Sequence, residues 1–137
     1  MRRYVYLDSS AVAKLFLPEP ERSALEGALL ERRGLFTSRL SLTECGRIVT
    51  RLGREVTARF IEDVFGPFVL IDLSSDILRA AGGLQPSGLR SLDAIHVASA
   101  LSLGDPSLEI ITYDQRMAEA ARAHGLTVVQ PGRPSQA

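Results

Sequence analysis

Short β-rich runs alternate with helical stretches along the whole chain, and this alternation limits the folds open to it. The predicted strands cover residues 4–7, 35–38, 68–73, 108–113 and 126–129. Helices are predicted over 11–17, 19–33, 41–52, 55–65, 91–103 and 115–124, and one more follows a cap at 74–76. Since hairpin signals are few, the pattern predicts an α/β domain with a mainly parallel sheet of about five strands. The almost continuous apolar run at 68–73 is typical of a strand buried on both faces.

The 137-residue chain is long enough for one domain with a sizeable core. No repeat or linker divides it, so we expect one domain over 1–130 and a flexible tail over 131–137. No apolar run approaches the ~20 residues of a membrane-spanning helix. The first residues lack the apolar segment of a signal peptide, so we expect a cytoplasmic protein. The single cysteine, Cys45, excludes an internal disulfide and is expected in the core.

The charge balance argues against a broadly basic, nucleic-acid-coating surface. Sixteen Lys and Arg residues match sixteen Asp and Glu residues, for a formal net charge of zero. Lys14 is the only lysine, and the other 15 bases are arginines. We attribute this bias to genome composition. Selection for phosphate binding is the alternative, because arginine makes paired hydrogen bonds to phosphate.

Four acidic residues stand at strand carboxyl ends or helix amino ends. Asp8 ends the first predicted strand, and Asp114 follows the fourth. Glu44 and Asp93 lie close to the starts of their helices. In a parallel α/β sheet these positions share one edge, which is where such sheets bind ligands.

Structural roles account for some of these acids and not for others. Asp114 is a candidate helix cap, and Glu44 a candidate partner of Arg47. Asp93 would favour the dipole of its helix, but that helix is apolar almost all round, and an unpaired buried charge is costly. Asp8 has the same difficulty at the end of a central strand. Four converging carboxylates would repel one another unless a divalent cation lay between them.

The type of ligand atom indicates which cation. Carboxylate oxygens, without His or Cys at zinc spacing, favour Mg²⁺ or Mn²⁺. Such an ion lowers the pKa of a bound water and stabilises charge on a phosphodiester. The residues therefore predict metal-dependent phosphodiester hydrolysis.

Four segments together resemble the PIN-domain nucleases, and the size of the chain is similar to that of the VapC toxins of type II toxin–antitoxin modules. The segments are 6–11 (YLDSSA), 41–44 (SLTE), 89–98 (LRSLDAIHVA) and 112–118 (TYDQRMA). Any one of them is a weak signal, but four in this order are specific. The resemblance extends from Tyr4 to about Gln130.

The resemblance implies a three-layer fold and an acidic pocket that binds Mg²⁺ or Mn²⁺ and cleaves RNA. By position, Asp8 and Asp93 match the principal metal-binding acids, Glu44 the third and Asp114 the fourth. Thr112 matches a small hydroxyl residue beside the pocket. The resemblance also implies a cognate VapB-like antitoxin, bound over the pocket and a nearby groove, and a homodimer.

Five further residues near these segments call for an interpretation. Ser9 and Ser10 are expected to cap a helix, with Ser9 also a candidate neighbour of the metal. His96 lies one helical turn after the acid of its helix and is expected to be half-buried with its hydrogen bonds satisfied. Lys14 and Arg116 lie within reach of the acidic edge by sequence and are candidate contacts for RNA phosphate.

Two other functions stay open. One is a PIN-domain RNA-processing nuclease without an antitoxin, which the absence of a small upstream antitoxin gene would indicate. The other is a phosphate-accepting, receiver-like domain, although the chain lacks the paired acid and the lysine that such a domain needs.

Without the four site acids, 12 acids face 16 bases, a balance of +4. Local, metal-dependent engagement of RNA is therefore compatible with a neutral chain.

Overall fold

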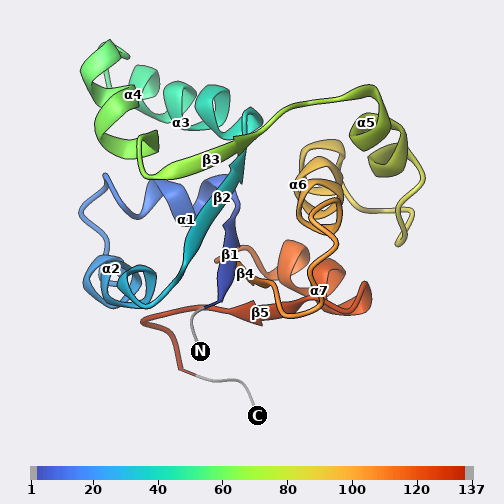
Figure 1. Ribbon diagram of the computed structural model, residues 1–137. Coiled ribbons are helices and arrows are strands. Elements are labelled where there is room, and N and C mark those ends of the chain that lie inside the picture. Colours follow the sequence, from blue (N-terminus) through green and yellow to red (C-terminus); the bar gives the residue numbers. More distant parts are fainter. Residues whose placement is uncertain (1–2, 135–137) are drawn as a thin grey trace.

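A five-stranded sheet runs through the middle of the molecule in the order β3–β2–β1–β4–β5. The computed structural model describes residues 3–134 (Figure 1). The strands are β1 (Tyr4–Leu7), β2 (Gly34–Ser38), β3 (Phe68–Ile71), β4 (Glu109–Ile111) and β5 (Thr127–Val129). Every neighbouring pair in this sheet is parallel. The predicted α/β fold with a parallel sheet of five strands is confirmed.

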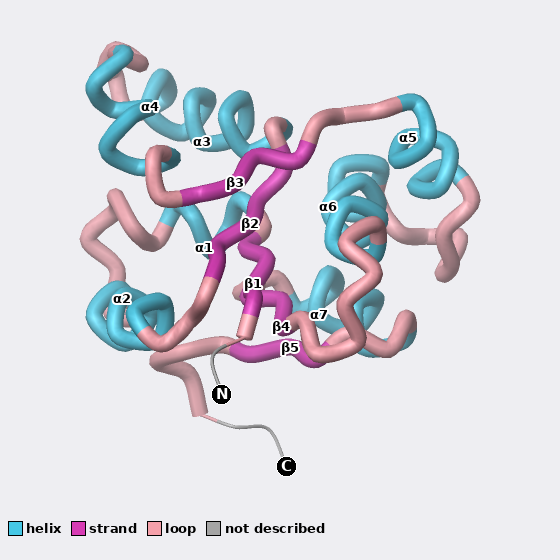
Figure 2. Tube along the Cα trace, in the orientation of Figure 1, coloured by secondary structure: helices cyan, strands magenta, loops and turns pink. Residues whose placement is uncertain are grey.

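Helices cover both faces of the sheet and complete three layers (Figures 1 and 2). One layer contains α1 (Ser9–Ala13), α2 (Arg22–Leu30), α3 (Leu40–Arg51) and α4 (Ala58–Phe65). The other contains α5 (Ser75–Gly82), α6 (Ser91–Leu101) and α7 (Gln115–Ala123). Alternation along β1 serves both layers, because successive strand side chains point to opposite faces. Val5 and Leu7 pack with residues of α1–α4, and Tyr6 packs with residues of α6 and α7.

A side-chain cap explains where α1, α4, α5 and α7 begin. Thr57 caps α4 by accepting a hydrogen bond from the amide of Phe60 (3.0 Å), and Ser74 caps α5 through the amide of Ile77 (3.2 Å). The predicted cap at 74–76 is therefore confirmed. The predicted cap at Ser9 and Ser10 is wrong, because Asp8 is the N-cap of α1.

The run at 68–73 does not form a strand buried on both faces. Within the part of the chain that the structure describes, β3 is an edge strand that pairs only with β2, and Val69 is 56% exposed. Side chains of this apolar run are therefore divided between the two faces of the sheet. Phe68 is buried on one face, and Val69 is exposed on the other. Hydrophobicity alone did not reveal that this strand lies at the edge.

The strand order reverses beside β1, and this determines where a site can form. From β1 the chain builds β2 and β3 on one side, and it then crosses back to place β4 and β5 on the other. The carboxyl ends of β1 and β4 therefore border the crevice at which parallel α/β sheets bind ligands.

The segment after β5 is attached to the domain as far as the structure describes it. Arg133 donates hydrogen bonds to Glu21 (3.1 Å) and to the carbonyl of Tyr113 (2.9 Å), and the Tyr113 hydroxyl donates to the carbonyl of Pro131 (2.7 Å). The remainder of the predicted flexible tail, 135–137, lies outside the described residues. None of the helices within 3–134 combines the length and the hydropathy needed to span a membrane.

Candidate active site

Asp8 occupies the carboxyl end of the central strand, and its side chain is fixed by three hydrogen bonds. Oδ1 accepts from the amide of Ala11 (3.0 Å) and the hydroxyl of Ser10 (2.7 Å), and Oδ2 accepts from the hydroxyl of Thr112 (2.6 Å). Asp8 is only 2% exposed. Burial raises the pKa of its carboxyl above the ordinary value, while nearby His96 and the three hydrogen bonds act to lower it.

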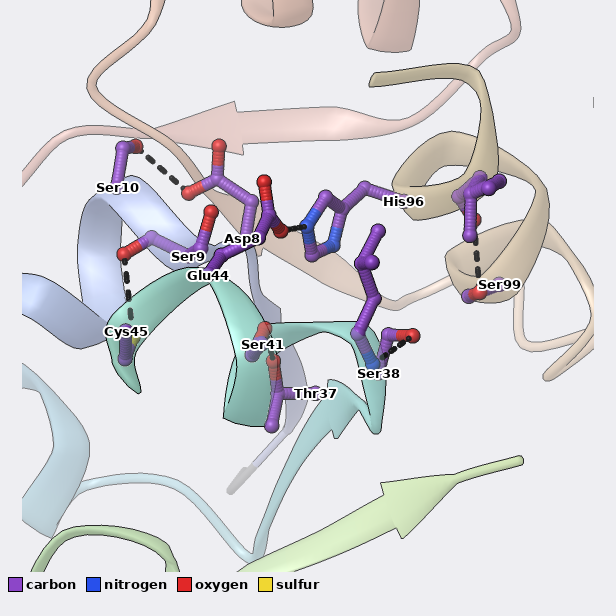
Figure 3. A network of polar contacts seen from close by, with 12 residues as sticks. Asp8, Ser9, Ser10, Thr37, Ser38, Ser41, Glu44, Cys45, His96 and Ser99 are labelled. Atoms are coloured by element: carbon purple, nitrogen blue, oxygen red, sulfur yellow. Dashed lines mark hydrogen bonds and ion pairs between the residues drawn. The ribbon is translucent and has the colours of Figure 1, made fainter. Parts of the chain in front are cut away.

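Glu44 belongs to α3 and reaches across to α6 (Figure 3). Its Oε1 lies 2.7 Å from Nε2 of His96, and Nδ1 of the same ring lies 2.6 Å from the hydroxyl of Tyr6. Burial, and then the charge of Asp8, raise the pKa of Tyr6 well above its ordinary value, so the phenol stays protonated. Both nitrogens of the His96 ring are therefore engaged, Nδ1 with the Tyr6 hydroxyl and Nε2 with the Glu44 carboxylate.

Asp93 lies half-buried in the first turn of α6. No hydrogen bond or ion pair that the structure shows within 3–134 uses its carboxylate. Burial raises the pKa of Asp93 most, the charges of Asp114, Asp8 and Glu44 raise it further, and His96 lowers it. Asp93 thus shares one electrostatic neighbourhood with the other three acids.

Asp114 follows β4 and is the N-cap of α7, as its capping interpretation predicts. Its Oδ1 accepts from the amides of Arg116 (2.9 Å) and Met117 (3.3 Å). The fully buried Thr112 connects this acid to Asp8, because its hydroxyl donates to Asp8 and accepts from the amide of Asp114 (3.2 Å). The ends of β1 and β4 are therefore tied together through one threonine.

The acids fit a hard divalent cation in their chemistry. Among residues 3–134, no three His, Cys, Asp or Glu side chains lie close enough to hold a metal ion as they stand. Mg²⁺ keeps several water ligands, however, and commonly uses only one or two carboxylates. The charges of neighbouring carboxylates contribute to the raised pKa of Asp93, and a cation would offset that repulsion. One or both of the carboxylates of Asp8 and Asp93 would suffice to hold it.

Lys14 pairs with two glutamates outside the group of four site acids. Its Nζ lies 3.1 Å from Glu21 and 3.8 Å from Glu19, and 5.0 Å from the centre of the Tyr113 ring. These contacts join α1 to the start of α2 and to the end of β4. These contacts give the ammonium group a role in the fold, and its contact with RNA phosphate stays a prediction.

The structure also places the remaining residues that the sequence analysis singled out. Ser10, not Ser9, hydrogen-bonds Asp8. Arg116 is exposed on α7 and lines a cavity together with Asp93. Cys45 is fully buried as predicted, and burial raises the pKa of its thiol to about 12.

Two components of the site were not predicted from the sequence. The hydrogen bonds of His96 are satisfied as predicted, but the residue is 1% exposed rather than half-buried, and its partners, Tyr6 and Glu44, were not foreseen. The expected pairing of Glu44 with Arg47 is also absent from the ion pairs seen within 3–134. Tyr6 lies two residues before Asp8 in a buried strand. A tyrosine hydroxyl in such a strand needs a hydrogen-bond partner, and this is the one feature of the local sequence that could have indicated the contact with His96.

Comparisons with known proteins agree with this geometry. The family model described as PIN domain matches residues 5–123. Ribonuclease VapC46 of Mycobacterium tuberculosis is 39% identical over 127 residues, which cover 93% of this chain and 97% of that protein. Ribonuclease VapC35 of the same species is 35% identical over 133 residues, covering 94% of this chain and 98% of that protein.

Solved structures share the fold at lower identity. A toxin–antitoxin complex from Klebsiella pneumoniae matches with a TM-score of 0.70 at 23% identity, covering 93% of this chain and 97% of that one. The family match, the identity to curated relatives and the shared fold lead to one conclusion. The chain belongs to the PIN-domain family and is related over nearly its whole length to VapC ribonucleases.

Proposed function

We propose that the chain is a metal-dependent endoribonuclease and the toxin of a type II toxin–antitoxin module. The observation that carries this proposal is that Thr112 links Asp8 to Asp114 at the crevice beside β1, near the charge of Asp93, in a member of the PIN-domain family. The names of its VapC relatives, which are ribonucleases, support RNA as the substrate. The family match over 5–123 supports a nuclease domain at 1–130.

Asp8 and Asp93 hold the cation in this proposal, which is Mg²⁺ with Mn²⁺ as a substitute. When bound, the cation supplies acidified water and stabilises negative charge on the phosphodiester. Thr112 and Ser10 fix the carboxylate of Asp8 toward the crevice end of β1. Asp114 completes the acidic shell while it caps α7.

Glu44 orients the attacking water. His96 holds Oε1 of Glu44, which leaves Oε2 as the oxygen available to accept a proton from that water. Tyr6 in turn fixes the imidazole, so the orientation of Glu44 is set from within the core. The reaction is hydrolysis of a phosphodiester bond, with the leaving oxygen taking up a proton from solvent.

The test compares two single-atom changes to carboxyl groups. Asp93→Asn should abolish cleavage of cellular RNA by the purified chain in Mg²⁺, and EDTA should abolish cleavage by the unchanged chain. Asp63→Asn is the matched control, because Asp63 is exposed on α4 and pairs only with Arg59 (3.6 Å) among residues 3–134. Full activity in Asp93→Asn, or full activity in EDTA, contradicts the proposal.

The antitoxin and the homodimer are parts of the same proposal. The fold shared with a toxin–antitoxin complex supports an antitoxin partner. Expression of the chain should arrest growth, and co-expression of a small adjacent gene should restore it. Growth arrest that no adjacent gene relieves favours an RNA-processing nuclease instead. Light scattering of the purified chain measures the expected dimer.

A further inference from the structure

A cavity of about 600 Å³ lies beside Asp93, between the start of α6, one side of α7 and the segment 85–90 that leads into α6. Its volume falls within the range of small-molecule sites. Asp93 forms part of its wall, so the cavity is continuous with the proposed active site. The function described above does not use this space.

Two arginines line the cavity. Arg90 immediately precedes α6, Arg116 lies in the first turn of α7, and both are exposed. Neither takes part in an ion pair that the structure shows within 3–134, whereas Arg39, Arg59 and Arg79 pair with aspartates. An arginine without an acidic partner keeps its hydrogen-bond donors for a phosphate, which its planar guanidinium group can contact twice. Glu119 also lines the cavity and limits its net positive charge.

The remaining wall is mainly apolar and contains small side chains. Leu89 and Pro86 come from the segment before α6, and Ala120 and Ala123 come from α7. The ring of His124 fastens the two walls together, because its Nε2–H donates to the carbonyl of Gln85 (2.6 Å). This arrangement leaves room for a flat ring against an apolar surface, with phosphate-binding groups at its edge.

We infer that this cavity binds the nucleoside next to the scissile bond of the RNA, with Arg90 and Arg116 contacting its phosphate. The inference rests on the proposed ribonuclease function, since an RNA chain that is cleaved beside Asp93 must continue over the adjacent surface of the protein. The base packs against Leu89 and Ala120. Contact with one nucleotide beside the cut gives the enzyme a means of selecting its cleavage position.

The first test measures binding without cleavage. The four nucleoside 5′-monophosphates are added separately to the isotopically labelled chain in EDTA, and amide shifts are followed by NMR. At least one should shift amides in 85–90 and 116–124. Arg116→Gln should weaken its binding by roughly tenfold, the effect of losing about one charge-assisted hydrogen bond. Arg122→Gln on the same helix is the matched control, because Arg122 is exposed and does not line the cavity.

A second variant tests the apolar wall. Ala123 is exposed at the end of α7, so Ala123→Phe should fill the cavity without crowding the core. It should abolish nucleotide binding and leave binding of inorganic phosphate unchanged. The inference is overturned if no monophosphate shifts these amides, or if Arg122→Gln weakens binding as much as Arg116→Gln. A tetraglutamate peptide tests whether the arginines bind any acidic ligand. If the peptide shifts these amides and the nucleotides do not, the inference is overturned as well.

Cleavage assays separate this inference from the proposed function. Arg116→Gln should raise KM for RNA several-fold with little change in kcat, and Ala123→Phe should change which ends are produced. If the unchanged chain cleaves RNA and both variants match it in KM and in product ends, the cavity inference fails and the proposed function stands. If the unchanged chain binds a nucleotide here but cleaves no RNA in Mg²⁺, the proposed function fails.

Discussion

His96 on α6 and Glu44 on α3 are joined by a hydrogen bond of 2.7 Å between Nε2 and Oε1. Since the opposite nitrogen of the ring contacts Tyr6 in β1, one imidazole connects the core of the sheet to an acid of the site. Such a chain is strong only while every member is satisfied. It therefore connects the stability of the fold to the geometry of the acidic site.

Tyr6→Phe should lower the free energy of unfolding by about 1–3 kcal/mol, because it leaves Nδ1 of His96 buried without its hydrogen-bond partner. It should also reduce kcat, since the orientation of Glu44 depends on that ring. Urea unfolding and RNA cleavage measure the two effects. Tyr4→Phe is the control on the same strand, since Tyr4 is 37% exposed and packs edge-on against Phe36. Equal stability losses in the two variants would contradict the prediction.

Asp8→Asn should stabilise the metal-free chain at neutral pH. Burial raises the pKa of Asp8 above its ordinary value of 3.8, so the folded chain binds this proton more tightly than the unfolded chain. The stability from that proton is fully present below the unfolded pKa and is lost as pH rises through the folded pKa. The advantage of Asp8→Asn over the unchanged chain should therefore shrink as pH falls from about 7 to about 4.

Urea unfolding of both proteins in EDTA across this pH range measures that difference. Glu21 titrates in both proteins, with a pKa lowered chiefly by its hydrogen bond to Lys14, so its opposite pH dependence cancels. A variant that is less stable than the unchanged chain at pH 7, or an advantage that grows on acidification, would show that the charge of Asp8 favours folding.

Mg²⁺ should raise the thermal unfolding midpoint of the unchanged chain. A ligand that binds only the folded state adds about 2.7 kcal/mol at 100 times its Kd. Asp93→Asn should remove most of this gain, because the half-buried Asp93 is one of the two acids proposed to hold the ion. Differential scanning fluorimetry of both proteins, with and without Mg²⁺, measures the change in the unfolding midpoint. An equal gain in Asp93→Asn would place the ion elsewhere.

Gly132→Ala and Gly27→Ala should have opposite effects on stability. Gly132 has φ +88° and its added Cβ would lie 3.0 Å from Cα of Glu21, so the alanine should cost about 1–2 kcal/mol. Gly27 lies within α2 with nothing near its added Cβ, so the alanine should add about 0.5–1 kcal/mol. Urea unfolding of the pair measures both signs. A neutral Gly132→Ala would show that the close approach of Gly132 to Glu21 contributes little to stability.

The sequence by itself determined the fold class and the positions of the acids. Each predicted strand was a local β-rich run, and three of the acids follow a strand or lie in the first turn of a helix, whereas Glu44 lies beyond the first turn of α3. Parallel strands bring their carboxyl ends to one edge, so the sequence alone predicts that Asp8 and Asp114 lie at the same edge of the sheet. The capping role of Asp114 was equally local, because a cap bonds amides only two or three residues away.

Only the tertiary structure decided what surrounds the acids. Nothing local distinguishes β3, at the edge, from a central strand, because strand order depends on how the whole chain crosses over. Tyr6 and His96 are 90 residues apart, and His96 and Glu44 are 52 apart. Lys14 pairs with Glu21 across a bend that two prolines create. Hydrophobic periodicity reports which side of an element is buried, whereas the partner of a polar side chain is set by packing between distant elements.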